Sequence, residues 1–121
     1  MFAIDVDSDL PIYAQISEGI VLAIARGELK PGAALPSVRQ LSRELVVNPN
    51  TVARAYTELE REGLVVSQPG RGIFVAPPRN DLSQTARNRR LTELLDRWLT
   101  EAVHLGFSAD EVLALAAQRA A

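Results

Sequence analysis

Cysteine is absent from this chain of 121 residues, and histidine occurs once, at His104. Without thiols the chain has no disulfide, no thiolate zinc site and no cysteine nucleophile, and one imidazole is too few for a histidine-based metal site. The length accommodates one compact domain with a small appendage, and it cannot hold a large catalytic domain. We therefore expect a protein that is not an enzyme and that uses no cofactor.

Long hydrophobic runs are also missing. No stretch of 18 apolar residues occurs, so no transmembrane helix and no membrane partner are expected. The first ten residues carry Asp5, Asp7 and Asp9 where a secretory signal would have basic and then apolar residues. These observations predict a soluble, cytoplasmic protein.

The net charge of −2 argues at first against a nucleic-acid partner, but the charge is unevenly distributed. Residues 1–29 sum to −4, residues 30–78 to +2 and residues 79–121 to zero. The middle of the chain is therefore its basic part. Within it, residues 32–57 contain three arginines and a single glutamate, which makes this stretch the candidate anion-binding surface.

Apolar residues recur with helical spacing in three segments, which predict helices at about residues 11–27, 37–46 and 48–63. The third segment has the most complete start signal. Asn48 can cap this helix and Pro49 suits its first position.

After residue 63 the hydrophobic period changes from helical to alternating. Residues 64–67 and 73–75 read as short strands, and the sequence QPGRG between them has the composition of a turn. The prolines at 77 and 78 indicate a stiff linker. Two helices joined by a tight turn and followed by a hairpin predict a winged helix-turn-helix over residues 1–78.

Residues 79–121 predict two more helices, a helical hairpin whose second helix starts at Ser108 with a capping box to Glu111. The expected fold class is thus mainly α with a small β-hairpin. The apolar stripe of this segment is too large to leave in water and too small to form its own core. Burial against the winged domain or against a second copy would cover it, and we favour a homodimer. The candidate dimerisation residues are Leu91, Leu94, Leu95, Trp98, Ala102, Leu105, Val112 and Leu113.

The third predicted helix separates into an apolar face and a polar face. The polar face begins with Asn50 and Arg54, and Thr51 lies beside its start. Asparagine can read adenine in a major groove, and arginine can read guanine or hold a phosphate. A solvated helix face is the alternative interpretation. The helix before this one and the hairpin after it favour DNA recognition.

Candidate DNA contacts also occur outside that helix. Arg39 and Arg43 lie one turn apart on the second helix, where phosphate contacts are expected, and Ser37 adds a hydroxyl or a helix cap. At the hairpin tip, Gly70 lets the backbone approach a groove and Arg71 suits a minor groove. The alternatives are ordinary surface charge for the arginines and plain turn geometry for the glycine.

These residues resemble a known family across about residues 10–76. The combination of PG and LPS before the second helix, NPNTV at the third, LEREG at its end and a GRG wing is similar to the GntR family of transcriptional regulators. The tail, with LGFS and EVL, resembles the short two-helix unit of the YtrA subfamily.

The resemblance implies DNA contacts from Arg39, from the start of the third helix at Asn48, Asn50 and Thr51, and from the wing glycine Gly70. Other branches of the family carry arginines where this chain has Pro49 and Ala53, and we infer Arg54 as the substitute.

The expected function is a sequence-specific DNA-binding transcriptional repressor that binds a palindromic double-stranded operator as a homodimer. Family members commonly sense a metabolite through a C-terminal domain, but this tail is far shorter, which leaves open whether a small-molecule effector binds. One alternative is a winged-helix module for protein contacts without DNA binding. Another is the front end of an aminotransferase-like regulator. Two observations argue against it: the only lysine is Lys30, and the residues after 78 are too few for such a fold.

Overall fold

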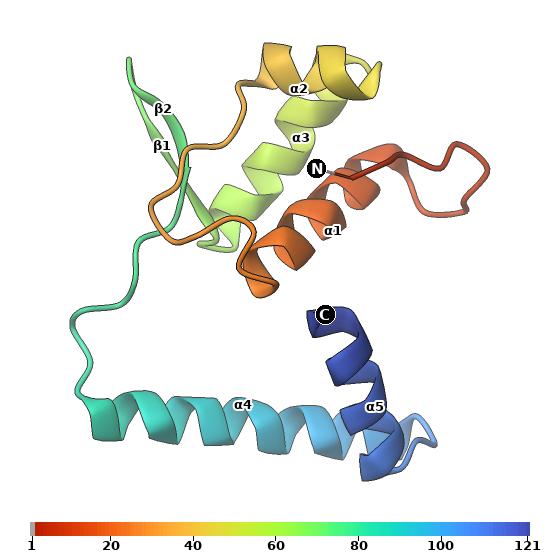
Figure 1. The fold of residues 1–121 in the computed structure, drawn as a ribbon, viewed down its shortest axis with the longest axis vertical. Coiled ribbons are helices and arrows are strands. Elements are labelled where there is room, and N and C mark those ends of the chain that lie inside the picture. Colours follow the sequence, from red (N-terminus) through yellow and green to blue (C-terminus); the bar gives the residue numbers. More distant parts are fainter. Residues whose placement is uncertain (1) are drawn as a thin grey trace. The chain divides into compact units, whose positions relative to one another are not determined.

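The computed structural model describes residues 2–121, which divide into two compact units, one ending at Pro78 and one beginning at Arg79 (Figure 1). The first unit contains α1 (Ile12–Ala25), α2 (Val38–Leu45), α3 (Pro49–Arg61), β1 (Val65–Gln68) and β2 (Gly72–Val75), and the second contains α4 (Gln84–His104) and α5 (Ala109–Ala120). This mainly helical architecture with one β-hairpin confirms the fold class expected from the sequence. Among the residues described, no helix combines the length and the apolar character needed to cross a membrane.

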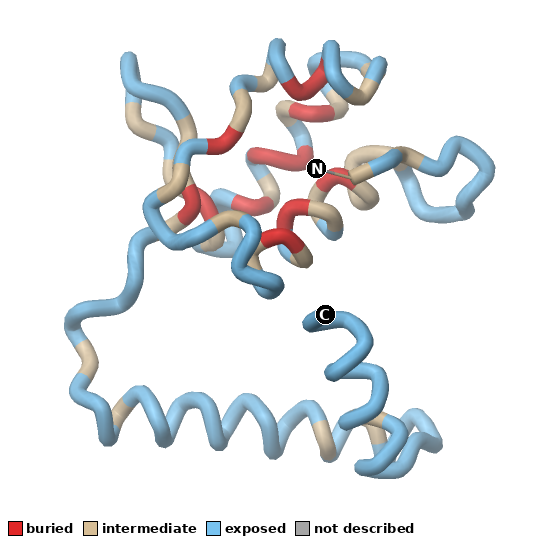
Figure 2. Tube along the Cα trace, in the orientation of Figure 1, coloured by how far each residue is buried: buried red, intermediate tan, exposed pale blue. Residues whose placement is uncertain are grey.

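The core of the first unit lies where its three helices and the hairpin face one another, as the buried positions in Figure 2 show. On α3 the predicted apolar stripe is confirmed, because Val52, Ala55, Tyr56 and Leu59 are all buried. Each large apolar side chain removed from water stabilises the fold by about 1.5–3 kcal/mol. The largest fully buried side chains are Ile16, Ile20, Leu41, Val52, Leu59 and Val65.

The hairpin is joined by a third backbone segment that the sequence did not predict. β1 and β2 pair antiparallel from Val65 opposite Val75 to Gln68 opposite Gly72. Beyond β2, Ala34 forms an isolated bridge with Phe74, and the Val75 N–H donates to the carbonyl of Ala33 over 2.8 Å. The segment that precedes α2 therefore holds the hairpin in place against the helices.

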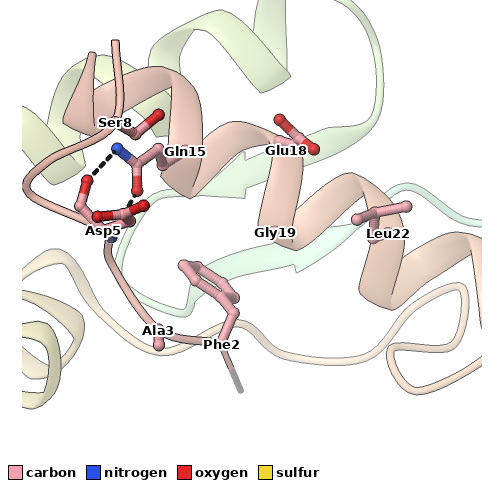
Figure 3. A pocket seen from close by; sticks show the side chains of 8 residues that line it. All are labelled: Phe2, Ala3, Asp5, Ser8, Gln15, Glu18, Gly19 and Leu22. Atoms are coloured by element: carbon pink, nitrogen blue, oxygen red, sulfur yellow. Dashed lines mark hydrogen bonds between the residues drawn. The ribbon is translucent and has the colours of Figure 1, made fainter. Parts of the chain in front are cut away.

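The N-terminal segment, expected only to be acidic, packs along α1 (Figure 3). The Gln15 side chain accepts from the Asp5 N–H over 2.8 Å and donates to the carbonyls of Asp5 and Leu10 over 2.8 and 2.9 Å. Phe2 lies so close to Gly19 that a Cβ built there would be 2.6 Å from the ring. Gln15 and Gly19 thus attach the start of the chain to α1 beside a small pocket of about 240 Å³.

The second unit is a pair of helices with an ordered connection. α4 begins earlier than its apolar stripe suggests, because Ser83 caps it by accepting from the Ala86 N–H over 3.1 Å. The predicted capping box of α5 is confirmed, since the Ser108 and Glu111 side chains each accept a hydrogen bond from the other residue's backbone N–H. Neither α4 nor α5 contains a buried residue.

Candidate nucleic-acid interface

The first surface element of interest is the N-terminus of α2. The Ser37 hydroxyl accepts from the Gln40 N–H over 3.0 Å, while the Gln40 side chain accepts from the Ser37 N–H over 3.0 Å. The two residues form a reciprocal capping box that satisfies backbone donors at the helix start. Ser37 is therefore a helix cap, one of the two roles expected for it, and the S-x-x-Q spacing of Ser37 and Gln40 is the sequence signal for this capping box.

Arg39 and Arg43 are both exposed on α2. Arg43 donates from Nε to the carbonyl of Arg39 over 3.4 Å, which leans its side chain along the helix towards Arg39. The pair therefore presents two adjacent positive charges on one helix, the arrangement that suits a phosphate backbone.

The turn between α2 and α3 contains a β-branched residue, Val46, in a left-handed backbone conformation. Val46 ends α2 with φ of 56° and is 88% exposed. A β-branched residue in the left-handed region is strained, because its side chain crowds the backbone there. The Val47 N–H donates to the carbonyl of Ser42 over 3.0 Å and closes the turn, which sets the direction in which α3 leaves.

The start of α3 is organised by its cap. Asn48 accepts from the Asn50 N–H through Oδ1 over 2.8 Å, and Pro49 occupies the first helical position, as predicted. The Asn50 side chain is exposed, and Thr51 is partly buried. The amide oxygen of Asn48 is thus occupied by capping, while Asn50 presents its whole amide to the surface at the positive end of the helix dipole.

Arg54 lies one turn further along α3 and differs from the sequence interpretation in one respect. Its side chain is 60% exposed, as expected for an outward position. Its guanidinium carbon, however, lies 3.6 Å from the centre of the Tyr13 ring on α1, and its Nε is 3.7 Å from Oε1 of Glu58. Arg54 is therefore held by two neighbours rather than projecting freely.

The last two candidate residues, Gly70 and Arg71, lie at the tip of the hairpin. Gly70 has φ of 76°, a left-handed conformation that favours glycine, and the Arg71 N–H closes the turn by donating to the carbonyl of Gln68 over 2.9 Å. Arg71 is exposed at the tip. Within the wing, Glu60 Oε2 accepts from the Ser67 N–H of β1 over 2.9 Å, which ties the wing to α3.

A groove of about 320 Å³ runs between the start of α2, α3 and the wing. Tyr56 lines it, and its hydroxyl donates to the carbonyl of Pro36 over 2.7 Å. Burial, with a smaller contribution from Glu44, raises the pKa of the Tyr56 phenol to about 12, so the donor keeps its proton throughout the physiological range. This bond joins α3 to the segment that leads into α2.

The candidate dimerisation residues all lie in the second unit. Ala102 and Val112 are partly buried and line an apolar groove of about 580 Å³. The remaining six are exposed, each by at least 44% of its surface: Leu91, Leu94, Leu95, Trp98, Leu105 and Leu113.

Tyr13 and Glu58 are the neighbours that sequence reasoning missed. The spacing of Arg54 and Glu58, four residues apart on one helix, was a readable signal for the ion pair. Nothing local signals Tyr13, because it meets Arg54 only through the packing of α1 against α3.

Together, α2, the tight turn, α3 and the two-stranded wing define a winged helix-turn-helix protein. The chain belongs to the GntR family: the family described as bacterial regulatory proteins, gntR family, matches residues 12–75. Two relatives from Bacillus subtilis are similar over most of their length. The HTH-type transcriptional regulator YhcF is 37% identical over 88% of this chain and 87% of its own. The HTH-type transcriptional repressor YtrA is 35% identical over 93% of this chain and 86% of its own.

Solved structures agree with this assignment. A Listeria monocytogenes protein described as a transcriptional antiterminator has a TM-score of 0.70 at 34% identity, covering 100% of this chain and 90% of its own. YtrA from Sulfolobus acidocaldarius, a GntR-family transcription factor, has a TM-score of 0.64 at 36% identity, covering 97% and 94%. The DNA-binding domain of AraR in complex with operator ORX1 has a TM-score of 0.56 at 29% identity, covering 63% of this chain and 100% of its own.

Proposed function

We propose that this protein is a transcriptional repressor that recognises a specific DNA operator through α3. The observation that carries the proposal is the exposed polar start of α3, with Asn50 and Arg54, next to the arginines of α2 and the wing. Two comparisons support it. The relative YtrA is named a transcriptional repressor, and the DNA-binding domain of AraR has been solved in complex with its operators.

We assign sequence reading to three residues of α3. Asn50 offers a complete amide that can pair with adenine, and Arg54 can bond to guanine through its terminal nitrogens. Thr51, partly buried beside them, can contact a thymine methyl or a phosphate.

The remaining candidates position the protein on the DNA backbone and in the minor groove. Arg39 and Arg43 bind phosphates from α2, and the helix caps Ser37 and Asn48 contribute the side-chain hydroxyl and amide N–H donors that capping leaves unused. Gly70 permits close approach of the wing, and Arg71 enters the minor groove.

The second unit supplies the dimer in this proposal. Its exposed apolar side chains, which include Trp98 and Leu113, offer a surface that a second copy of the same unit can cover by twofold symmetry. Two copies of α3 then meet two half-sites, so the operator is a palindrome. A repressor of this kind acts by occupying promoter DNA.

Selection of bound duplexes from a random pool tests the proposal most directly. The expected result is an inverted repeat whose binding weakens steeply as salt rises, because bound arginines release counterions from the phosphates. A pool that yields no enriched sequence, with no salt-sensitive mobility shift, contradicts DNA recognition and favours a protein-binding role for the winged unit.

Single substitutions then separate the roles. Arg54→Ala should weaken binding to the selected duplex by about 5- to 150-fold and relax base preference at the position it reads. Arg39→Ala should weaken binding to all sequences alike and reduce the salt slope by about one. Lys30→Ala is the matched control. This substitution also removes one positive charge, at an exposed residue near the open end of the hairpin. Equal losses in all three variants would contradict the assigned roles.

Dimerisation is tested by sedimentation of the intact chain. Leu113→Asp puts a charge on the exposed apolar surface and should yield monomers with weaker operator binding. Thr92→Asp adds the same charge to an exposed polar position of α4 and should leave the dimer intact. A dimer that survives Leu113→Asp and Trp98→Asp contradicts the role of this surface.

A further inference from the structure

The guanidinium of Arg54 is confined from two sides although most of its side chain is exposed. On one side is the face of the Tyr13 ring, 3.6 Å from the guanidinium carbon. On the other is Glu58, whose Oε1 is 3.7 Å from Nε of Arg54. Tyr13 belongs to α1, so its contact with Arg54 depends on how α1 packs against α3, whereas Glu58 lies four residues after Arg54 on α3 itself.

The geometry restrains the guanidinium without using its terminal donors. A guanidinium carbon so close to the ring centre lies against the ring face, because an N–H bond aimed at the ring would hold the carbon further away. The donors of a guanidinium lie in its own plane and point away from such a contact. At 3.7 Å the approach of Glu58 to Nε is an ion pair beyond hydrogen-bond distance. The two terminal nitrogens of Arg54 thus keep their donors for a guanine edge or a phosphate.

We propose that Tyr13 is a positioning residue that orders Arg54 in the free protein for DNA recognition, with Glu58 as a weaker second restraint. The proposal rests on the proposed DNA-binding function and deepens it, because it assigns a specificity role to a residue of α1. α1 thereby acts as more than a structural support for the recognition helix.

The physical reason is the entropy of a long side chain. An unrestrained arginine loses rotamer freedom when it binds, and this loss opposes association. A side chain already held in place loses less, so the complex is stronger with no additional contact to DNA. The expected contribution is about a three- to tenfold gain in affinity. The gain applies to the correct base more than to a wrong one, because only the correct base matches the restrained donors.

The test uses the full chain and the duplex that the wild-type protein selects from a random pool, together with variants of that duplex changed at one base pair each. Tyr13→Leu keeps an apolar side chain but removes the ring face. It should weaken binding about three- to tenfold and reduce discrimination at the same base position as Arg54→Ala. Tyr13→Phe keeps the ring face and should bind within about twofold of wild type.

A double-mutant cycle separates positioning from a merely structural role. When Arg54 is already alanine, adding Tyr13→Leu should cause no further loss, because there is no guanidinium left to restrain. Glu58→Gln should lower affinity less than Tyr13→Leu does. Thermal unfolding of each variant checks that the winged unit remains folded.

Additive losses from Tyr13→Leu and Arg54→Ala would overturn the proposal, as would a Tyr13→Leu variant with wild-type affinity and base discrimination. An Arg54→Ala variant with wild-type affinity and base discrimination would overturn it too, although the protein would still bind DNA. If the wild-type protein selects no duplex, the proposed function fails first, and this outcome is distinct from the others.

Discussion

The two units of this protein use apolar residues in opposite ways. In the first, the stripes of α1, α2 and α3 face one another and the hairpin, and they build a core with Ile16, Ile20 and Leu59 almost completely buried. In the second, α4 packs with the shorter α5, neither helix contains a buried residue, and Trp98 remains 62% exposed. Apolar composition alone therefore does not make a core, because burial also requires enough facing surfaces.

This difference separates two tasks within one short chain. A core with five elements around it can hold the polar side chains of α3 in fixed positions, which the proposed recognition of base edges requires. Two helices without a core leave an apolar surface, which a second copy covers in the proposed dimer. This difference predicts that the first unit is stable by itself and that the proposed dimer stabilises the second unit.

The largest expected effect comes from the core of the first unit. Leu59→Ala should lower the free energy of unfolding by about 3 kcal/mol, since Leu59 is 1% exposed and its loss leaves a cavity. Urea unfolding followed by tyrosine signals measures it, because both tyrosines lie in the first unit. Leu94→Ala, at an exposed position of α4, is the control and should leave that transition unchanged. A loss under about 1 kcal/mol in Leu59→Ala would contradict the assigned core.

The next two effects concern Tyr56 and its partly buried hydrogen bond to Pro36. Tyr56→Phe should cost about 1–2 kcal/mol at neutral pH, because the Pro36 carbonyl loses its partner.

The same residue predicts an alkaline limit. The folded-state pKa of about 12 lies above the ordinary value of 10.0, so the folded protein holds this proton more tightly than the unfolded chain does. Stability should therefore fall as pH rises from 10 to 12, by up to about 2.7 kcal/mol. Unfolding midpoints across this range should show the loss in wild type and in Tyr13→Phe, but a smaller one in Tyr56→Phe. An identical alkaline loss in all three proteins would rule out this origin.

The unfolding midpoints of the two units should also respond differently to protein concentration. Trp98 is the single tryptophan and reports on the second unit. If association stabilises this unit, a tenfold rise in protein concentration should stabilise it by about 1.4 kcal/mol, seen as a shift in the tryptophan-detected midpoint. The tyrosine-detected transition of the first unit should shift less. If the midpoints of both transitions are independent of protein concentration, the second unit is stable without a partner.

The smallest effect is a gain within the first unit. Val46→Asn should raise the free energy of unfolding by about 0.5–1 kcal/mol, because asparagine tolerates the left-handed conformation better than valine. Val47→Asn is the control next to it and should destabilise, since Val47 packs against the core. Thermal unfolding of the two variants gives the comparison, and a destabilised Val46→Asn would show that the turn is not strained.

Local structure was predictable from the sequence to within a few residues. The stripe of α3, its cap at Asn48 and the capping box of α5 all appear as the spacing indicated. They depend on neighbours within one helical turn, so a short stretch of chain contains the information. The wing followed from its turn composition, although the pairing of Ala34 with Phe74 did not.

The sequence by itself determined which segments are helical, where most of them begin, which faces are apolar and which polar residues share the outward face of α3. Only the tertiary structure decided that Tyr13 covers Arg54, that Gln15 fastens the N-terminal segment and that the apolar side chains of α4 remain exposed. The physical reason is that these outcomes depend on surfaces meeting across many residues of chain. The restraint on Arg54 exists because α1 packs on α3, and a periodic pattern in either helix alone does not contain that contact.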